Sequence, residues 1–138
     1  MSDREHPLGL NVGRGRENAL EVRDALEPEE RERVERTVTA LLDLLGKAHT
    51  MAILSAFAFA GEPLRFSELE RSTGVPANTL TERLRELVAA GLLRREAYNE
   101  VPPRVEYEPT AKAEALFPAF AHIHRWAIEY DIEPDGET

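Results

Sequence analysis

The side chains in this sequence best suited to specific chemistry are arginines and short polar residues within a stretch over 76–90. In the major groove of DNA, Arg can donate two hydrogen bonds to guanine, Asn can pair with adenine, and Glu can accept from cytosine N4. With Leu80 toward a core, rotation by about 100° per residue places several such side chains outward. The candidate contacts are Asn78, Thr79, Thr81, Glu82, Arg83 and Arg85, with Arg83 at the border. The alternative is a solvated helix face that carries these charges.

More arginines lie on two strand-like runs that follow this stretch. Arginines on such a hairpin can bind backbone phosphates or enter a narrow minor groove. The candidate DNA contacts are Arg94, Arg95 and Arg104, with Pro102 and Pro103 stiffening the turn and Arg65 as a further candidate upstream. The alternative is a surface ion pair of Arg104 with Glu96 or Glu106 across the strands.

The sequence offers little support for catalysis or metal binding. Cysteine is absent, which excludes disulfides, thiolate metal sites, cysteine nucleophiles and a thiol-based switch. His122 and His124 are two residues apart and so lie on different faces of a helix, where they cannot share a metal ion. No Ser/His/Asp arrangement, phosphate-binding glycine loop or catalytic carboxylate pair stands out. We therefore expect no enzyme, no metal and no cofactor.

Charge is distributed unevenly along the 138 residues. Seventeen basic and twenty-six acidic residues give a net charge of −9, and only Lys47 and Lys112 are lysines. This balance favours a halophilic source such as an archaeon with a salt-rich cytoplasm, or else an acidic protein from a GC-rich genome. Residues 1–45 carry −4, residues 46–110 carry −1 and residues 111–138 carry −4. The candidate DNA contacts therefore fall in the one nearly neutral segment.

Apolar residues make up 42% of the chain, enough for the core of a single domain. The longest apolar stretch, Met51–Ala60, is about half as long as a membrane-spanning helix, and the first residues lack the apolar run of a signal peptide. We expect a cytoplasmic protein with three parts. These are a flexible or weakly structured leader over 1–27, a folded domain over 28–130 and a disordered acidic tail over 131–138.

Turn residues and apolar spacing predict a mainly helical domain with one β-hairpin. Pro28 opens the first helix and Gly46 stops it, and residues 47–60 are apolar nearly all round, which predicts a helix buried on most sides. A capping box over Ser67–Glu70 starts a short helix that Gly74 ends. The remaining expected elements are a helix over 76–90, strands over 92–97 and 104–108, and a last helix from Thr110 to about Tyr130, bent or restarted at Pro118.

Two short helices joined by a tight turn and followed at once by a β-hairpin predict a winged helix-turn-helix of the α+β class. Over residues 42–127 the sequence resembles the HxlR-type winged-helix regulators, which are related to the MarR group. The matching stretches are Leu44–Gly46, Thr50–Leu54, Pro63–Leu69, Leu80–Leu87, Ala90–Leu92 and Tyr98–Tyr107, followed by Thr110, Leu116, Pro118 and Trp126. The resemblance implies a dimeric, sequence-specific DNA-binding transcriptional regulator.

Three departures from the family pattern bear on this resemblance. Family members often carry a cysteine ahead of the first core helix that senses electrophiles or oxidants, and this chain has none. His49 stands where a tryptophan is usual. Pro76 and Asn78 replace the serine and lysine common at the start of the recognition helix, which removes one expected DNA contact and implies a different affinity or operator.

The last helix carries more apolar surface than a small winged helix needs for its own core, which predicts a partner helix. The alternative is that this surface belongs only to the core. The resemblance implies that the terminal helices form a two-fold interface and set two recognition helices about one DNA turn apart, which suits a pseudo-palindromic operator. The candidate interface residues are Val38, Leu41, Leu45, Phe120, Ile123, Trp126, Ala127 and Tyr130.

A second function class competes with DNA binding. Some acidic winged-helix domains bind protein instead, and the net charge of −9 and the position of Glu82 in the middle of the outward face favour that class. The hairpin arginines and the nearly neutral middle segment favour double-stranded DNA. The sequence identifies no small-molecule effector, and it does not distinguish an activator from a repressor.

Overall fold

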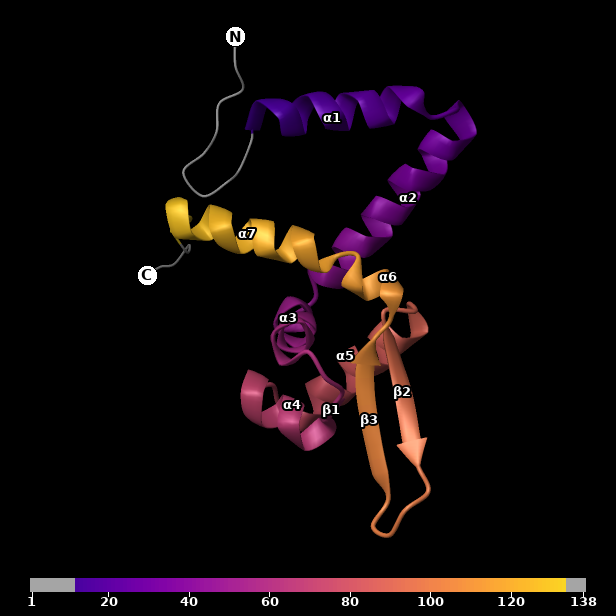
Figure 1. The fold of residues 1–138 in the computed structure, drawn as a ribbon, viewed down its shortest axis with the longest axis vertical. Helices are drawn as coiled ribbons and strands as arrows, with labels where there is room; N and C mark the ends of the chain where they lie inside the picture. The colour runs from indigo at the N-terminus through magenta and orange to yellow at the C-terminus, as the bar shows by residue number, and fades with distance from the viewer. Residues whose placement is uncertain (1–11, 134–138) are drawn as a thin grey trace. The chain divides into compact units, whose positions relative to one another are not determined.

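The computed structural model of the chain describes residues 12–133, with side chains from residue 15 onward. Its helices are α1 Val12–Ala25, α2 Pro28–Leu45, α3 Thr50–Ala60, α4 Phe66–Thr73, α5 Ala77–Ala89, α6 Ala111–Glu114 and α7 Phe117–Glu129 (Figure 1). Its strands are β1 Leu64–Arg65, β2 Leu93–Tyr98 and β3 Arg104–Pro109. The chain divides into two compact units, which we call the helix-turn-helix unit, Leu44–Phe120, and the flanking unit, Met1–Asp43 with Ala121–Thr138.

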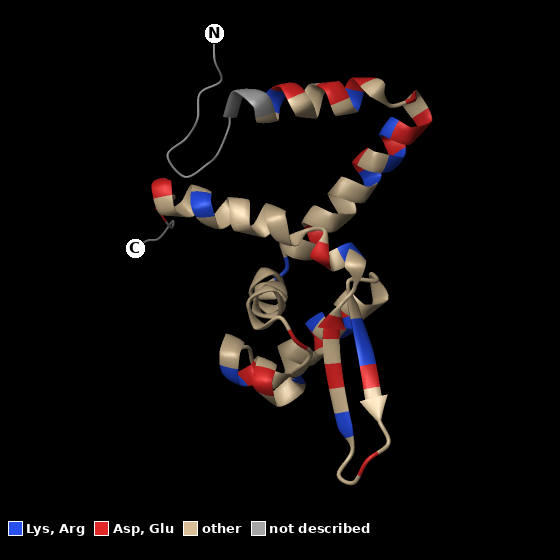
Figure 2. Cartoon of the chain, viewed as in Figure 1, with Lys and Arg blue, Asp and Glu red and all other residues tan. Residues whose placement is uncertain are grey.

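The helix-turn-helix unit contains an antiparallel sheet with strand order β1–β3–β2. Leu93 lies opposite Pro109, and Arg95 lies opposite Tyr107. Directly opposed residues share a face of a sheet, and because Leu93 is buried and Tyr107 packs against the core, this face points inward. The other face follows from the alternation of side chains along each strand and carries charges of both signs, visible along β2 and β3 in Figure 2.

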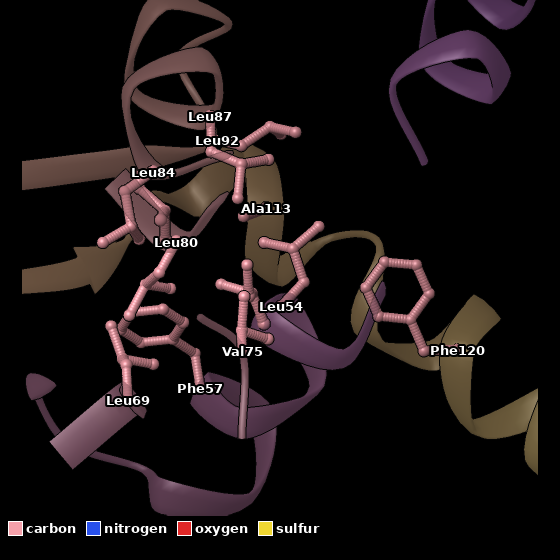
Figure 3. Packing of buried hydrophobic residues seen from close by; sticks show 12 residues of the cluster. Leu54, Phe57, Leu69, Val75, Leu80, Leu84, Leu87, Leu92, Ala113 and Phe120 are labelled. Atoms are coloured by element: carbon pink, nitrogen blue, oxygen red, sulfur yellow. The ribbon is translucent and has the colours of Figure 1, made fainter. Parts of the chain in front are cut away.

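One apolar core holds α3, α4, α5 and the sheet together (Figure 3). The buried stripe of α5 recurs at three- and four-residue spacing, as expected for a helix with one face inward. The core residues are Ile53, Leu54, Phe57, Leu69, Val75, Leu80, Leu84, Leu87, Leu92, Leu93, Ala113 and Phe120. The sequence predicts a helix buried on most sides at 47–60, but Phe59 near its end is 80% exposed. Burial on α3 is therefore confined to the side that carries Ile53 and Phe57.

Short polar contacts set the ends of the helices. The backbone N–H of Arg65 donates to Glu68 Oε1 at 2.7 Å, so the carboxylate that caps α4 is Glu68, and not Glu70 as the predicted capping box has it. Gly74 ends α4 in the left-handed region with φ 72°, as expected. The Thr110 hydroxyl donates to Gly91 O at 2.7 Å and accepts from the Ala113 N–H, which confirms Thr110 as the cap of α6.

Two predicted segments differ from the structure, and a third agrees with it. Residues 46–49 form turns with His49 at φ 73°, so α3 begins at Thr50 instead of 47. The last helix is restarted, as expected near Pro118, with the second piece beginning at Phe117. Proline is tolerated in the first turn of a helix because the N–H it lacks has no helical acceptor there. The leader predicted over 1–27 contains a helix, α1, although residues 1–11 lie outside the described residues.

The flanking unit leaves most of its apolar side chains exposed. None of the residues of α2 is buried, and residues 121–133 are all exposed. Its exposed large apolar residues are Leu20, Val22, Val38, Leu42, Ile123, Trp126, Ile128, Tyr130 and Ile132. No single helix among the described residues is long and apolar enough to cross a membrane, and α2 and α3 satisfy that test only when they are taken together across their break.

Candidate nucleic-acid interface

Helix α5 separates its side chains into a buried stripe and a polar stripe. Leu80, Leu84 and Leu87 are buried, which fixes the rotation of the helix and leaves the opposite side for solvent. The candidate base contacts on that side are Asn78, Thr81, Glu82 and Arg85, all exposed, with Thr79 half-buried beside them. The predicted outward face of the helix is therefore present, while its contact with DNA stays a prediction.

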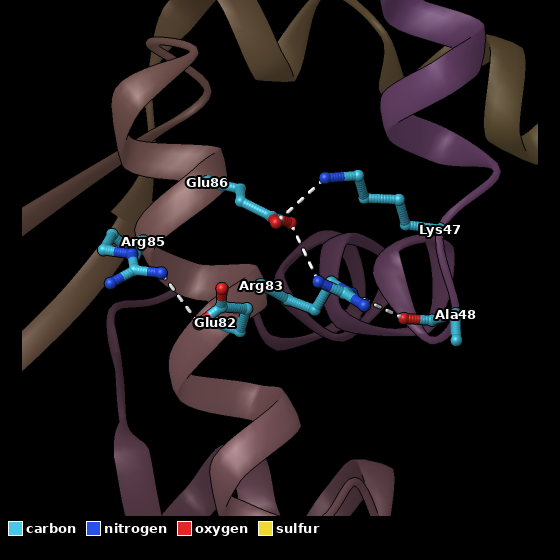
Figure 4. A network of polar contacts seen from close by, with 6 residues as sticks. All are labelled: Lys47, Ala48, Glu82, Arg83, Arg85 and Glu86. Carbon is cyan, nitrogen blue, oxygen red and sulfur yellow. Dashed lines mark hydrogen bonds and ion pairs between the residues drawn. The ribbon is translucent and has the colours of Figure 1, made fainter.

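Two members of the outward face are joined by an ion pair. Arg85 Nη2 lies 2.7 Å from Glu82 Oε1, one turn apart on α5 (Figure 4). The two side chains are 69% and 51% exposed, so both remain accessible to a partner. An exposed pair with this spacing contributes only a few tenths of a kcal/mol to helix stability. The pair matters mainly because it holds the Arg85 guanidinium beside Glu82 on the outward face of α5.

Arg83 belongs to a different network on the side of α5 (Figure 4). Its Nη1 donates to Glu86 Oε1 at 3.0 Å, and its Nε donates to Ala48 O at 3.0 Å. Lys47 Nζ also donates to Glu86, at 2.9 Å. The hydrogen bond from Lys47 and the nearby charge of Arg83 lower the pKa of Glu86 below its ordinary value.

The predicted role of Arg83 as a border DNA contact is therefore corrected. Its side chain is 18% exposed, with Nε directed at Ala48 O in the turn between α2 and α3 and Nη1 directed at Glu86 on α5 itself. Arg83 differs from the exposed Arg85 because most of its guanidinium is covered and it also donates to a backbone carbonyl, so it is not presented to a phosphate. Arg83 thus connects α5 to Ala48, and Glu86 connects it to Lys47, both 35 or more residues away in the sequence.

The charged side of the hairpin is organised as ion pairs. Arg94 binds Glu108 directly across β2 and β3, and the hydrogen bond from Arg94 to Glu108 raises the pKa of Arg94. Arg104 is 29% exposed and lies 3.1 Å from Glu100. Its Nε also lies 3.7 Å from Glu106, so one of the two alternative pairings considered for Arg104 is present, although both residues lie on β3.

The tip of the hairpin is further tied by an aromatic contact. The Arg104 guanidinium carbon lies 4.1 Å from the centroid of the Tyr98 ring, which is opposite it in the sheet. This cation–π contact links the last residue of β2 to the first of β3. Pro102 and Pro103 are exposed in the turn between them. The register places Tyr98 beside Arg104, a contact that the sequence pattern does not predict.

Two other candidate arginines have no ion pair among the described residues. Arg95 lies on β2 opposite Tyr107, on the inward face of the sheet, and is exposed. Arg65 lies on β1 opposite Glu106 and is also exposed. The hairpin therefore carries cations on both faces, with Arg95 on the face that packs toward α5 and the paired arginines on the other.

The candidate dimer residues fall into three groups. Val38, Ile123, Trp126, Ala127 and Tyr130 are exposed, as an interface in a single chain requires, while Leu41 and Leu45 are half-buried. Phe120 is wrong as an interface residue, because it is 4% exposed in the core of the helix-turn-helix unit. The first turn of α7 still belongs to that unit, where the Phe117 and Phe120 rings lie 6.1 Å apart. The described residues contain no cluster of three or more metal-binding side chains.

Comparison with known proteins agrees with this geometry. The model of the HxlR-like helix-turn-helix family matches residues 44–134. An HTH-type transcriptional regulator from Halalkalibacterium halodurans is 39% identical over 89 residues, which are 64% of this chain and 78% of the relative. One from Mycobacterium tuberculosis is 40% identical over 100 residues, which are 72% of this chain and 62% of the relative.

Solved structures show the same fold. A MarR-family transcriptional regulator from Enterococcus faecalis has a TM-score of 0.60 at 30% identity, covering 69% of this chain and 86% of that one. The oxidised form of the redox regulator HypR has a TM-score of 0.62 at 30% identity, covering 70% and 99%. This chain contains no cysteine. From the family match and these relatives, the chain belongs to the HxlR-like helix-turn-helix family and is a transcriptional regulator with a winged-helix fold.

Proposed function

We propose that this regulator binds double-stranded DNA as a homodimer, with α5 in the major groove and the β2–β3 hairpin on the backbone or in the minor groove. The observation that carries the proposal is the polar stripe of α5, which is exposed while its opposite face is buried in the core. An α-helix fits the width of the major groove, and its outward side chains reach the base edges.

The candidate residues take different roles in this proposal. Asn78 and Arg85 contact base edges, because their side chains can make paired hydrogen bonds with adenine and guanine. Thr79, Thr81 and Glu82 lie beside them on α5. The hairpin arginines and Arg65 bind phosphates, with Pro102 and Pro103 shaping the tip. Arg83 fixes α5 to the turn before α3 through its bond to Ala48 O, and it does not contact DNA.

Dimerisation is supported by the apolar side chains that the flanking unit exposes on α2 and α7, among them Val38 and Trp126. Exposed apolar surface of this kind is typical of an interface with another chain. A two-fold dimer presents two copies of α5, so we propose a pseudo-palindromic operator with half-sites about one helical turn apart. The site of action is chromosomal DNA in the cytoplasm. The acidic composition suits a cytoplasm that is rich in salt.

A protein partner in place of DNA is the second candidate function. It is favoured by the net charge of −9 and by the carboxylate of Glu82 on the outward face. The pairing of Glu82 with Arg85 offsets this carboxylate locally, which weakens that argument. The two candidates differ in whether any chromosomal fragment is bound in preference to random DNA.

The test is selection of fragments from the source genome, followed by affinity measurements on the selected operator and on random DNA. Arg85→Ala or Asn78→Ala should cost on the order of 1–3 kcal/mol on the operator and leave binding to random DNA nearly unchanged. Arg36→Ala on α2 removes the same charge outside the proposed surface and should change neither affinity. If the folded protein prefers no fragment at any salt concentration, the protein-partner function replaces DNA binding.

A further inference from the structure

Three of the five arginines on the proposed DNA surface are already bound to carboxylates of the same chain. Figure 2 shows the two signs side by side along the hairpin. The exposed fractions of Glu82 and Glu100 are 51% each, so these carboxylates are also accessible to ions from solution. The pairs are Arg85 with Glu82 at 2.7 Å, Arg94 with Glu108, and Arg104 with Glu100 at 3.1 Å and Glu106 at 3.7 Å.

An arginine paired in this way cannot bind a phosphate without leaving its carboxylate. An unpaired arginine that binds phosphate releases about 0.9 condensed cation per contact, which is why DNA affinity usually falls steeply with salt. When a paired arginine moves to the phosphate, the cation that leaves the DNA can be taken up by the carboxylate that the arginine has left. The number of free ions is then unchanged, and the salt dependence of that contact disappears.

We propose that the carboxylates beside Arg85, Arg94 and Arg104 exchange these arginines for solvent cations when DNA binds, so that operator affinity varies little with salt concentration. The inference rests on the proposed DNA contacts of α5 and the hairpin. It assigns a role to the acidic residues of this surface, which lie within a segment whose charge is only −1. These carboxylates compete with phosphate at low salt, and they offset the loss of affinity that screening causes at high salt.

Arg95 and Arg65 provide an internal contrast. Neither has an ion pair among the described residues, so each releases a DNA cation without uptake by a carboxylate. The overall slope of log affinity against log salt therefore reports the unpaired arginines, and the paired ones contribute little. A slope that is smaller in magnitude than the number of contacted phosphates is the expected signature.

The experiment measures that slope in KCl for the full chain on its selected operator. The variant Glu100→Gln/Glu106→Gln/Glu108→Gln keeps the shape of the three side chains and removes the charged partners of Arg94 and Arg104. Its matched control is Glu29→Gln/Glu32→Gln/Glu35→Gln on α2, which changes the net charge by the same amount in the flanking unit. Circular dichroism at each salt concentration confirms that the proteins are folded.

We expect a shallow slope for the unmodified chain and the control. The hairpin variant should bind more tightly at low salt, and its slope should steepen by about one for each freed arginine, or about two in all. A hairpin variant with the same slope as the control would overturn the inference. If the hairpin variant does not fold, a second experiment on the unmodified chain tests the inference. It compares operator affinity in potassium glutamate with operator affinity in potassium chloride.

Replacing chloride by glutamate tests whether the arginines are bound to carboxylates before DNA binds. Arginines that are free in the unbound protein hold chloride that DNA must displace, so glutamate, which binds more weakly, raises affinity. Arginines already bound to carboxylates hold no chloride, so only the unpaired Arg95 and Arg65 respond to the exchange, and we expect an increase in affinity of no more than about threefold. An increase of about tenfold or more would overturn the inference while leaving operator binding intact. Absence of any operator preference would instead overturn the proposed function, and this inference with it.

Discussion

The helix-turn-helix unit buries most of its large apolar side chains, whereas the flanking unit leaves most of them exposed. In the first, Ile53, Leu54 and Leu69 have no exposed surface. In the second, Ile123 and Ile128 on α7 are 52% and 76% exposed. The first unit is therefore stabilised by burial within one chain, whereas the apolar surface of the second stays exposed in the single chain, which supports the proposed dimer interface.

The contrast shows that the same sequence pattern can lie in a core or stay exposed in the single chain. Both α2 and α5 have apolar residues at helical spacing. On α5 that stripe contacts α3, α4 and the sheet through the core, while none of the residues of α2 is buried. Periodicity identifies the apolar side of a helix, but it does not identify what covers that side.

The largest expected effect comes from the core of the helix-turn-helix unit. Leu54→Ala leaves a cavity in a fully buried site, so the free energy of unfolding should fall by about 2–5 kcal/mol, a large part of the total for a small domain. Leu42→Ala in the flanking unit is the control, since Leu42 is 61% exposed and its loss should cost about 0.5 kcal/mol or less in the monomer. Urea unfolding at several protein concentrations measures both. Equal costs for the two variants in the monomer would contradict the contrast between the units.

The next largest expected effect is on dimerisation, and the helix-turn-helix unit should stay folded. Ile123→Glu places a carboxylate in the proposed dimer interface, where its desolvation is costly, so we expect a monomer with an operator affinity at least about tenfold lower. Light scattering and unfolding experiments separate loss of the dimer from loss of the fold.

His122→Glu is the matched control for this variant. It adds the same carboxylate to the neighbouring position of α7, outside the apolar stripe, and should remain dimeric. An Ile123→Glu protein that still scatters as a dimer and still binds the operator as tightly would rule out α7 as the interface.

The smallest effect is a pH dependence inside the helix-turn-helix unit. Lys47 lowers the pKa of Glu86 in the folded protein, so this carboxylate stabilises the fold above its ordinary value of 4.5 and the contribution is lost as pH falls through the lower folded value. Thermal melts of Glu86→Gln should lose less stability than the unmodified chain as pH falls below that value. Lys47→Met removes the main cause of the shift and should show the same weakened pH dependence. Identical pH profiles for all three proteins would show that the network does not stabilise the unit.

The elements that depend on local signals could be predicted from the sequence. The helix at 28–45 has the predicted bounds, and the last helix is interrupted near Pro118 as expected. Two short helices followed by a hairpin predicted the winged helix. The match to the HxlR-like family model confirms the predicted family. The polar stripe of α5 was also predictable, because 3.6 residues per turn fix which side chains share a face.

The partners of individual charges could not be predicted in the same way. Arg83 and Arg85 are two residues apart with the same side chain, yet one binds Ala48 O and the other Glu82. The choice depends on a turn 35 residues away from Arg83 in the sequence, which only packing brings close. Arg104 likewise has one candidate partner confirmed, Glu106, while Glu100 and the Tyr98 ring depend on the geometry of the tip.

The sequence by itself determined the order of the elements, the apolar side of each helix and the absence of thiols, because these depend on residue type and on spacing within one element. Tertiary structure decided that Phe120 is in the core, that Arg83 bonds the turn before α3, and that Arg94 and Arg104 on the hairpin are paired. These outcomes depend on which surfaces meet. Periodicity gives the direction of a side chain relative to its own helix or strand, and only the packed fold supplies the neighbour it meets there.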